Sequence, residues 1–370
     1  MVETKSRERI ILFKTRLHRG ELTPPHFGLI NWMGAQEVRT LPNINGVFCM
    51  VPGEVSDAEI MATGGVLAIE ENIKIKLLPW LHQKNKLTWW ENEQLIPWGV
   101  HYIGADICWQ ETRGRGVRVA VVDSGIDGEH PDLRTNLKGG INLIKRGASF
   151  QDDNGHGTHI AGIIASEDSD SGVIGVAPEA WLYSVKVLDE IGNGTILGAI
   201  EALQWCLYNR IDVVNMSFGT DKYSRAFEEA VRTAHEHGLL IVAAAGNDGE
   251  PGTVDYPAVF DETLCIAAVD SRGRLASYSS SGPEVDLLAP GSSIISSYKW
   301  GSYVSLSGSS MAAAHVSGAA ALLRARYPGE GIDVLRRRLL SGAKAQKWPA
   351  KSMTGAGITR VDTAIQGDFL

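Results

Sequence analysis

From residue 94 onward the chain alternates short apolar runs with segments of helical periodicity, and this alternation restricts the possible folds more than any other feature. The apolar runs at residues 119–122 and 239–245 are rich in valine and alanine and predict buried parallel strands. Residues 195–209 and 225–237 have the spacing of helices, and Gly238 is placed to end the second. Strands that alternate with helices predict an α/β fold with a doubly wound, mostly parallel sheet and right-handed crossovers.

Three polar residues lie at the edges of these elements, where open α/β sheets place their ligands. Asp123 follows the strand at 119–122, His156 opens a helix, and Ser310 lies in the first turn of an alanine-rich helix. Taken singly, the aspartate could form a turn, the histidine could be a surface or core residue, and the serine could cap its helix. Together they supply an acid, a base and a nucleophile in the chain order Asp, His, Ser.

A serine at the N-terminus of a helix is suited to acyl transfer. Its hydroxyl is a weak nucleophile near neutral pH, so a base such as His156 must accept its proton. Asp123 would hold the imidazole in the required tautomer and stabilise the imidazolium. Free backbone N–H groups and the helix dipole would stabilise an oxyanion beside Ser310.

The segments around all three residues closely resemble those of the subtilisin-like serine proteases, and the resemblance covers about residues 94–370. It implies a serine endopeptidase acting on polypeptides, with the amide of Asn247 and the backbone N–H of Ser310 as oxyanion donors. One alternative is a catalytically silent member of the family that acts as a binding or regulatory protein, against which the complete triad argues. Another is an ester or lipid hydrolase, which the residue order and the lack of a G-x-S-x-G motif disfavour.

Peptide substrates of this family bind as an added β-strand between two backbone segments. The resemblance assigns these segments to Gly192, Asn193 and Gly194 and to Ser217, Phe218 and Gly219. The walls of the pocket for the side chain before the cleaved bond are assigned to Ala244, Ala245 and Gly246, with Asp255 at the base. A carboxylate there would attract lysine or arginine, whereas a solvent-facing Asp255 would leave the family's preference for large apolar residues. The sequence leaves both possibilities open.

The resemblance also implies structural calcium, which takes hard oxygen ligands. The first site would use the side chains of Gln94, Asp132 and Ser169 and the carbonyls of Glu167, Ser171 and Val173. Ser169 stands where the family usually has asparagine, which weakens this site. A second, weaker site would use the carbonyls of Ala258 and Phe260 with Glu284. The alternative is that these carboxylates are ordinary solvated charges, and no organic cofactor is expected.

His159 lies three residues after His156 on the same helix face, a spacing that could suit a metal ion. The H-E-x-x-H zinc pattern is absent, and no further Cys or His pair completes a ligand set. We therefore expect His159 and His315 to be histidines of the core or of the surroundings of the site.

Residues 1–77 form a segment of a different kind. Strand patterns, such as those at 9–14 and 46–51, interleave with a helix that Ser56 and Glu59 would cap. The segment resembles the subtilase propeptide, a small α+β domain of ferredoxin-like fold, with an unrelated α+β domain as the alternative. The resemblance implies a self-processing proenzyme whose prodomain inhibits the catalytic domain.

The sequence predicts a linker at residues 78–93 and a catalytic domain at 94–370. The maturation bond is expected within the linker. Lys84 and Lys86 are candidate sites if a basic side chain is preferred, and Trp90 is one if an aromatic side chain is preferred.

Composition limits the partners and the compartment. A net charge of −8 over 370 residues argues against nucleic acid as a partner, and no run reaches the ~18 apolar residues of a membrane helix. The four cysteines are isolated in apolar settings, which predicts buried thiols rather than disulfides. The apolar run at residues 10–13 is too short for a signal peptide, which favours the cytoplasm; secretion is the alternative, because the family has both kinds of member. We expect a monomer.

Overall fold

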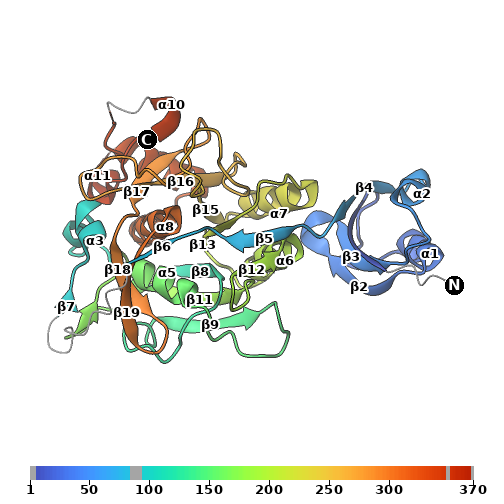
Figure 1. The fold of residues 1–370 in the computed structure, drawn as a ribbon, viewed down its shortest axis with the longest axis horizontal. Coiled ribbons are helices and arrows are strands. Elements are labelled where there is room, and N and C mark those ends of the chain that lie inside the picture. The colour runs from blue at the N-terminus through green and yellow to red at the C-terminus, as the bar shows by residue number, and fades with distance from the viewer. Residues whose placement is uncertain (1–5, 84–93, 347–350, 368–370) are drawn as a thin grey trace.

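A computed structural model describes residues 6–83, 94–346 and 351–367 (Figure 1). Its central element is a seven-stranded sheet with the order β17-β16-β15-β13-β8-β11-β9. Every neighbouring pair in this sheet is parallel, which confirms the predicted sheet. The strands are β8 (Arg118–Asp123), β9 (Leu137–Asn142), β11 (Trp181–Lys186), β13 (Val213–Met216), β15 (Leu240–Ala244), β16 (Thr263–Val269) and β17 (Leu287–Pro290).

Helices cover both faces of this sheet, as a doubly wound fold requires. The helices of one face are α5 (His156–Ala165) and α8 (Ser309–Arg326), and those of the other are α6 (Ile196–Tyr208) and α7 (Arg225–Glu236). In strand β8, Val119 and Val121 belong to the core around α5 and α8, whereas Ala120 and Val122 belong to the core around α6 and α7. The apolar run therefore contributes to two cores, because side chains alternate along a strand.

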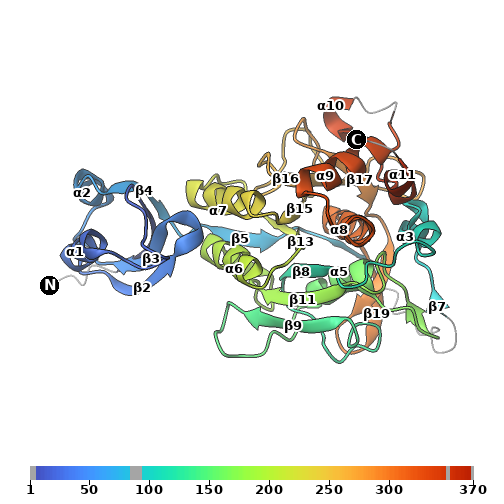
Figure 2. The same ribbon diagram turned by 180° about the vertical axis from the view of Figure 1, so that it is seen from behind.

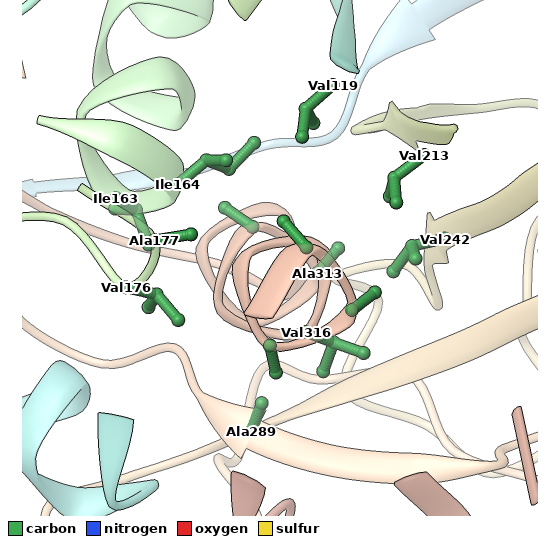
Figure 3. Close-up of a cluster of buried hydrophobic side chains, with 14 of the residues drawn as sticks. Val119, Ile163, Ile164, Val176, Ala177, Val213, Val242, Ala289, Ala313 and Val316 are labelled. Atoms are coloured by element: carbon green, nitrogen blue, oxygen red, sulfur yellow. The ribbon is translucent and has the colours of Figure 1, made fainter. Parts of the chain in front are cut away.

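Helix α8 is buried over most of its length. Figure 3 views it nearly end-on, with Val119, Val213 and Val242 of the sheet on one side and Ile163 and Ile164 of α5 on another. The small alanine side chains of α8 allow these neighbours to approach closely and pack densely. A helix without a polar face is expected in such a buried position.

Side-chain caps and a glycine set the ends of α6 and α7. The hydroxyl of Thr195 accepts the N–H of Gly198 at 3.3 Å at the start of α6. The hydroxyl of Ser224 accepts the N–H of Phe227 at 3.1 Å at the start of α7. Gly238, with a φ of +88°, follows the end of α7 and confirms the predicted stop.

Residues 7–71 form a separate unit at one end of the molecule (Figures 1 and 2). Its sheet is antiparallel with the order β2-β3-β1-β4. One face of the sheet packs against the two helices of this unit, and the other face packs against the core around α6 and α7. The elements are β1 (Arg7–Phe13), α1 (Pro24–Met33), β2 (Gln36–Leu41), a 3₁₀ turn η1 (Pro42–Ile44), β3 (Gly46–Val51), α2 (Asp57–Ala62) and β4 (Val66–Glu71).

The predicted cap of α2 is confirmed, because the Ser56 hydroxyl accepts the N–H of Glu59 at 3.2 Å and the Glu59 carboxylate accepts the N–H of Ser56 at 2.8 Å. Helix α1 and strand β2 were not predicted from the sequence. The capping residue of α1 is paired with His26 rather than with an acid or amide, so the usual start signal is missing.

Residues 74–83 leave the N-terminal unit and cross the larger one as two strands. Strand β5 (Lys74–Leu77) lies antiparallel between β12 (Asn193–Thr195) and β14 (Phe218–Gly219). Strand β6 (Leu81–Gln83) pairs with β19 (Ser302–Ser307), which also pairs with β18 (Ile294–Tyr298). The candidate cleavage sites Lys84, Lys86 and Trp90 lie outside the described residues.

The remaining elements complete the larger unit. Strand β7 (Gln94–Leu95) pairs in parallel with β10 (Gly172–Val173). Five further helices of the described residues are α3 (Trp98–Tyr102), α4 (Ala105–Cys108), α9 (Ile332–Gly342), α10 (Lys351–Thr354) and α11 (Val361–Gln366).

The four cysteines, Cys49, Cys108, Cys206 and Cys265, are buried free thiols, as predicted. Burial raises the pKa of Cys49 to about 11 and that of Cys108 to about 12, so these thiols are protonated at neutral pH. Within the described ranges, we find no helix with the length and apolar character needed to cross a membrane.

Candidate active site

The candidate acid and base meet where β8 ends and α5 begins. Asp123 is the last residue of β8, and His156 is the first residue of α5. Nδ1 of His156 lies 2.9 Å from Oδ1 and 3.0 Å from Oδ2 of Asp123, and both residues are fully buried. A carboxylate at Nδ1 favours the tautomer with the proton on that nitrogen, so Nε2 is free to act as a base.

A glycine and a second buried carboxylate bring α5 this close to β8. A Cβ atom on Gly157 would lie 2.1 Å from the carbonyl oxygen of Gly125, so only glycine allows the approach. Asp152, to which the sequence analysis gave no role, accepts hydrogen bonds from the hydroxyls of Ser124 at 2.9 Å and Thr158 at 2.6 Å. It therefore ties the residue after the candidate acid to the first turn of α5.

Ser310 lies in the first turn of α8, as predicted, and is fully buried. Its Oγ donates a hydrogen bond to the carbonyl of Ser217 at 3.3 Å. Nε2 of His156 is buried and has no hydrogen-bond partner among the described residues. The hydrogen bond from Ser310 to His156 that nucleophilic attack requires is therefore not formed in this state.

The side chain of Asn247 contacts the N-terminus of α8 through its oxygen and a carbonyl of residue 79 through its nitrogen. Its Oδ1 accepts the N–H of Ser309 at 2.9 Å. Its Nδ2 donates to the carbonyl of Pro79 at 2.7 Å. The predicted oxyanion donor is thus beside the candidate nucleophile and already contacts a peptide carbonyl of the chain.

The two predicted substrate-binding segments hold an extended strand, β5, between them. On one side Asn193 is paired with Lys76, and Gly194 with Ile75. On the other side Gly219 is paired with Lys76, and Phe218 is paired with the next residue of β5. This arrangement is β-strand addition, the mode in which extended peptides bind a sheet edge.

The residues after β5 cover the candidate base. The rings of Trp80 and His156 lie 5.1 Å apart between centroids, at an angle of 38°. Pro79 and Trp80 belong to the predicted linker, and neither was predicted to contact the site. No local signal could have indicated these contacts, because the partners of both residues lie far away in the sequence.

The residues predicted to form the side-chain pocket lie close together. Ala244 ends β15, and the carbonyl of Ala245 accepts the N–H of Asp255 at 2.9 Å. A Cβ atom on Gly219 would lie 2.7 Å from Oδ2 of Asp255, and one on Gly246 would lie 3.3 Å from it. The pKa of Asp255 is raised to about 7, mainly by burial and to a smaller extent by the negative charges of nearby carboxylates.

Lys186, at the end of β11, is a buried residue of the site that the sequence analysis missed. Its Nζ donates to the carbonyls of Ser124 and Leu188 and to the carboxylate of Asp153 at 2.7 Å. It therefore links the residue after Asp123 to the segments before α5 and after β11. The sequence offered one weak signal, a lysine at the end of an apolar strand.

His159 and His315 are core histidines, as predicted. Nε2 of His159 lies 3.1 Å from the carbonyl of Ile294, and Nδ1 of His315 lies 2.8 Å from the carbonyl of Met311. Burial, assisted by the charge of His156, lowers the pKa of His159 to about 3. Burial lowers the pKa of His315 to about 4. Both rings are therefore neutral at physiological pH.

Several residues of the first expected calcium site form hydrogen bonds with one another or with nearby backbone groups. Nε2 of Gln94 donates to the carbonyl of Glu167 at 2.8 Å. The carboxylate of Asp132 is buried and accepts the N–H of Val173 at 3.1 Å. The hydroxyl of Ser169 donates to the carbonyl of Ser171 at 3.0 Å. Among the residues that the structure describes, no group of three or more His, Cys, Asp or Glu side chains could hold a metal ion.

The surroundings of Asp132 fit a calcium ion only in part. Burial raises the pKa of Asp132, and a cation beside the carboxylate would offset that cost. The carboxylate already accepts hydrogen bonds from the hydroxyls of Tyr303 at 2.9 Å and Ser297 at 3.2 Å, so a calcium ion would have to share or replace these partners.

At the second expected site, the hydroxyl of Thr263 lies within hydrogen-bond distance of the carbonyls of Ala258 (3.2 Å) and Phe260 (2.9 Å). Oε2 of Glu284 is buried and has no hydrogen-bond partner among the described residues. This second site stays a prediction.

Comparison with known proteins assigns the chain to a family. A model described as the subtilase family matches residues 114–360. A thermostable alkaline protease of Halalkalibacterium halodurans is 43% identical over 278 residues, which is 74% of this chain and 74% of that protein. Subtilisin DY of Bacillus licheniformis is 40% identical over 277 residues, 74% of this chain and 100% of the relative. Subtilisin E of Bacillus subtilis is 43% identical over 258 residues, 68% of this chain and 67% of the relative.

Proposed function

The chain belongs to the subtilase family, and we propose that it is a self-processing proenzyme in which Asp123, His156 and Ser310 form the catalytic triad. As a subtilisin-type serine endopeptidase, it hydrolyses peptide bonds of polypeptides. The observation that carries the proposal is the 2.7 Å hydrogen bond from Asn247 to a peptide carbonyl of the chain itself, beside the buried His156–Asp123 pair. A carbonyl bound in this way is a substrate group at an oxyanion donor.

In the proposed reaction, Nε2 of His156 accepts the hydroxyl proton of Ser310 as Oγ forms a bond to the carbonyl carbon of the substrate. Asp123 holds Nδ1–H and stabilises the charge on the ring. The amide of Asn247 and the backbone N–H of Ser310 donate to the oxygen on which negative charge develops. His156 then protonates the departing amine as the C–N bond breaks, and water hydrolyses the acyl-enzyme with the same base.

Contacts between the two units support a role for residues 1–77 as an inhibitory prodomain. The carboxylate of Glu70 accepts the N–H of Arg225 at 2.9 Å, at the N-terminus of α7. Oδ1 of Asn72 accepts the N–H of Leu197 at 3.0 Å, at the N-terminus of α6. Both side chains satisfy free N–H groups of a helix, and the negative charge of Glu70 is favoured by the helix dipole.

Strand β5 then fills the cleft that a substrate would need, so docking of the prodomain and inhibition are linked. The maturation bond is proposed within residues 78–93, the segment that follows β5. Its described part, residues 78–83, passes Asn247 and His156. Cleavage there would release the strand from its covalent link to the catalytic domain at 94–370, and the same serine would serve maturation and proteolysis.

Subtilases bind calcium structurally as a family. In this chain we propose that Gln94, Asp132 and the loop at 167–173 hold one ion. Its part would be structural, since it would tie β7 to β10 and contribute no group to the reaction.

A fluorophosphonate probe tests the proposed function, because it labels only an activated serine. The purified chain should be labelled at Ser310 and should hydrolyse casein but not a long-chain ester. Absence of labelling would indicate a silent binding protein, and hydrolysis of the ester in preference to casein would indicate a lipid or ester hydrolase. The matched control is Ser302→Ala, which removes a hydroxyl that bonds the carbonyl of Lys299 at 2.8 Å and should still be labelled.

A further inference from the structure

The carboxylate of Asp255 lies between the two segments that would flank a substrate side chain. Asp255 is joined to one segment by the hydrogen bond from its N–H to the carbonyl of Ala245. Its neighbour Tyr256 is joined to the other by two backbone hydrogen bonds with Thr220, of 3.0 and 3.2 Å. These bonds fix the position of the Asp255 backbone relative to both walls.

The direction of the side chain follows from the two glycines that it faces. Oδ2 would be 2.7 Å from a Cβ atom on Gly219 and 3.3 Å from one on Gly246. Gly219 is also the residue of β14 that pairs with the strand in the cleft. The carboxylate therefore lies against the substrate-binding backbone, which does not fit the alternative of a solvent-facing side chain.

The carboxylate of Asp255 is partly buried without a cationic partner. No hydrogen bond or ion pair joins it to another described residue. The nearby charges that act on it are the carboxylates of Asp248 and Asp221, and both are negative. A carboxylate in such surroundings is stabilised by a cation that enters from the cleft.

From this geometry we infer that Asp255 makes the enzyme selective for substrates with lysine or arginine immediately before the cleaved bond. The inference rests on the proposed function and deepens it by naming the substrate class. Gly246 directly precedes Asn247, whose amide would hold the carbonyl of the cleaved bond, so the carboxylate of Asp255 lies beside the backbone that the residue before this bond would contact. A guanidinium or ammonium group there would form a charge-assisted hydrogen bond with Asp255 and balance the carboxylates behind it.

The test compares kcat/KM for matched peptides that differ only in having arginine, lysine, phenylalanine or leucine before the cleaved bond. The variants are Asp255→Asn, which keeps the shape and removes the charge, and Asp255→Ser, which also removes volume. Asp270→Asn is the charge-matched control, since its carboxylate pairs with Arg274 on the surface. Titration with a fluorophosphonate counts the active sites in each preparation.

We expect the arginine-to-phenylalanine ratio to fall about 10- to 100-fold in both Asp255 variants, the effect of losing one charge-assisted hydrogen bond. In the wild type the ratio should also rise between pH 6 and 8, as Asp255 ionises beside Asp248 and Asp221, and this rise should be absent in Asp255→Asn. A titrated, active variant with the wild-type ratio would overturn the inference and leave the proposed function intact. A wild type that neither binds the probe nor cleaves any peptide would overturn both.

Discussion

The side-chain amide of Asn247 donates a hydrogen bond of 2.7 Å to the carbonyl of Pro79. The register of the pairing between β5 and β14 instead brings Leu78, the preceding residue, into line with the substrate-binding segment. The pairing of Phe218 with Leu77, continued by one position, places Leu78 opposite Ser217. The hydroxyl of Ser310 meanwhile bonds the carbonyl of Ser217 and not His156. The bound segment is therefore not aligned for attack, as the proposed role of an intramolecular inhibitor requires.

Replacing Asn247 with alanine should lower kcat for peptide hydrolysis and the rate of self-processing by the same factor. The expected factor is ~10²–10³, the range known for the oxyanion amide of subtilisin itself. Asn247→Asp keeps the acceptor for the N–H of Ser309 but removes the donor, so it should be equally impaired. Asn209→Ala, at the end of α6, is the control. Normal turnover in Asn247→Ala would contradict the assigned role.

Replacing Glu70 with glutamine should weaken inhibition by the N-terminal unit, because the charge at the N-terminus of α7 is lost. Residues 1–77, added to the processed enzyme, should inhibit it, and the inhibition constant should rise about 10- to 100-fold in Glu70→Gln. Glu71→Gln is the matched control, because Glu71 is exposed and lies 3.9 Å from Arg9 within its own unit. Equal inhibition constants for the two variants would count against the docking contact.

The parallel sheet and the ends of its helices were predictable because their signals are local. The valine-rich run of β8, the helical spacing at 195–209 and 225–237 and the stop at Gly238 each act within a few residues. The order of the candidate acid, base and nucleophile along the chain could also be read directly from the sequence. The remaining features depend on contacts between distant segments, such as Lys186 with Asp153. Such contacts cannot be predicted from local sequence patterns.

Calcium should stabilise the protein if the first expected site is occupied. An ion present at 100 times its dissociation constant adds ~2.7 kcal/mol to the free energy of unfolding. Chelation should therefore lower Tm, and Asp132→Asn should remove most of the difference between calcium and EDTA. Both are measured in a Ser310→Ala background to prevent autolysis. Identical melting curves with millimolar calcium and with excess EDTA would contradict an occupied site.

The raised pKa of Asp255 predicts a pH-dependent cost in stability for the enzyme without substrate. The folded protein holds the proton more tightly than the unfolded chain, because the pKa rises from an ordinary 3.8 to about 7. Stability is therefore lost as pH increases through this window, and Asp255→Asn should avoid that loss. The Tm of Asp255→Asn minus that of the Ser310→Ala parent should grow between pH 4 and pH 8.

Asp270 provides a control of opposite sign for this measurement. Burial acts to raise the pKa of Asp270, but hydrogen bonds from Arg274 and Arg272 outweigh it and lower the pKa. The contribution of Asp270 to stability is thus present at neutral pH and lost in acid. The destabilisation by Asp270→Asn should therefore change little between pH 8 and pH 4 and should shrink only below the ordinary pKa of 3.8. A Tm difference for Asp255→Asn that does not change with pH would refute the predicted ionisation.

The most direct test of the account is the length of the Ser310→Ala chain after expression and purification beside the wild type. Intact mass spectrometry and N-terminal sequencing should find the wild type cut within residues 78–93 and Ser310→Ala at full length. Loss of a triad serine lowers turnover by about 10⁶, a value established on subtilisin, so no residual self-cleavage is expected. Ser310→Ala that removes its own N-terminal unit at the wild-type rate would contradict the claim that Ser310 carries out both maturation and proteolysis.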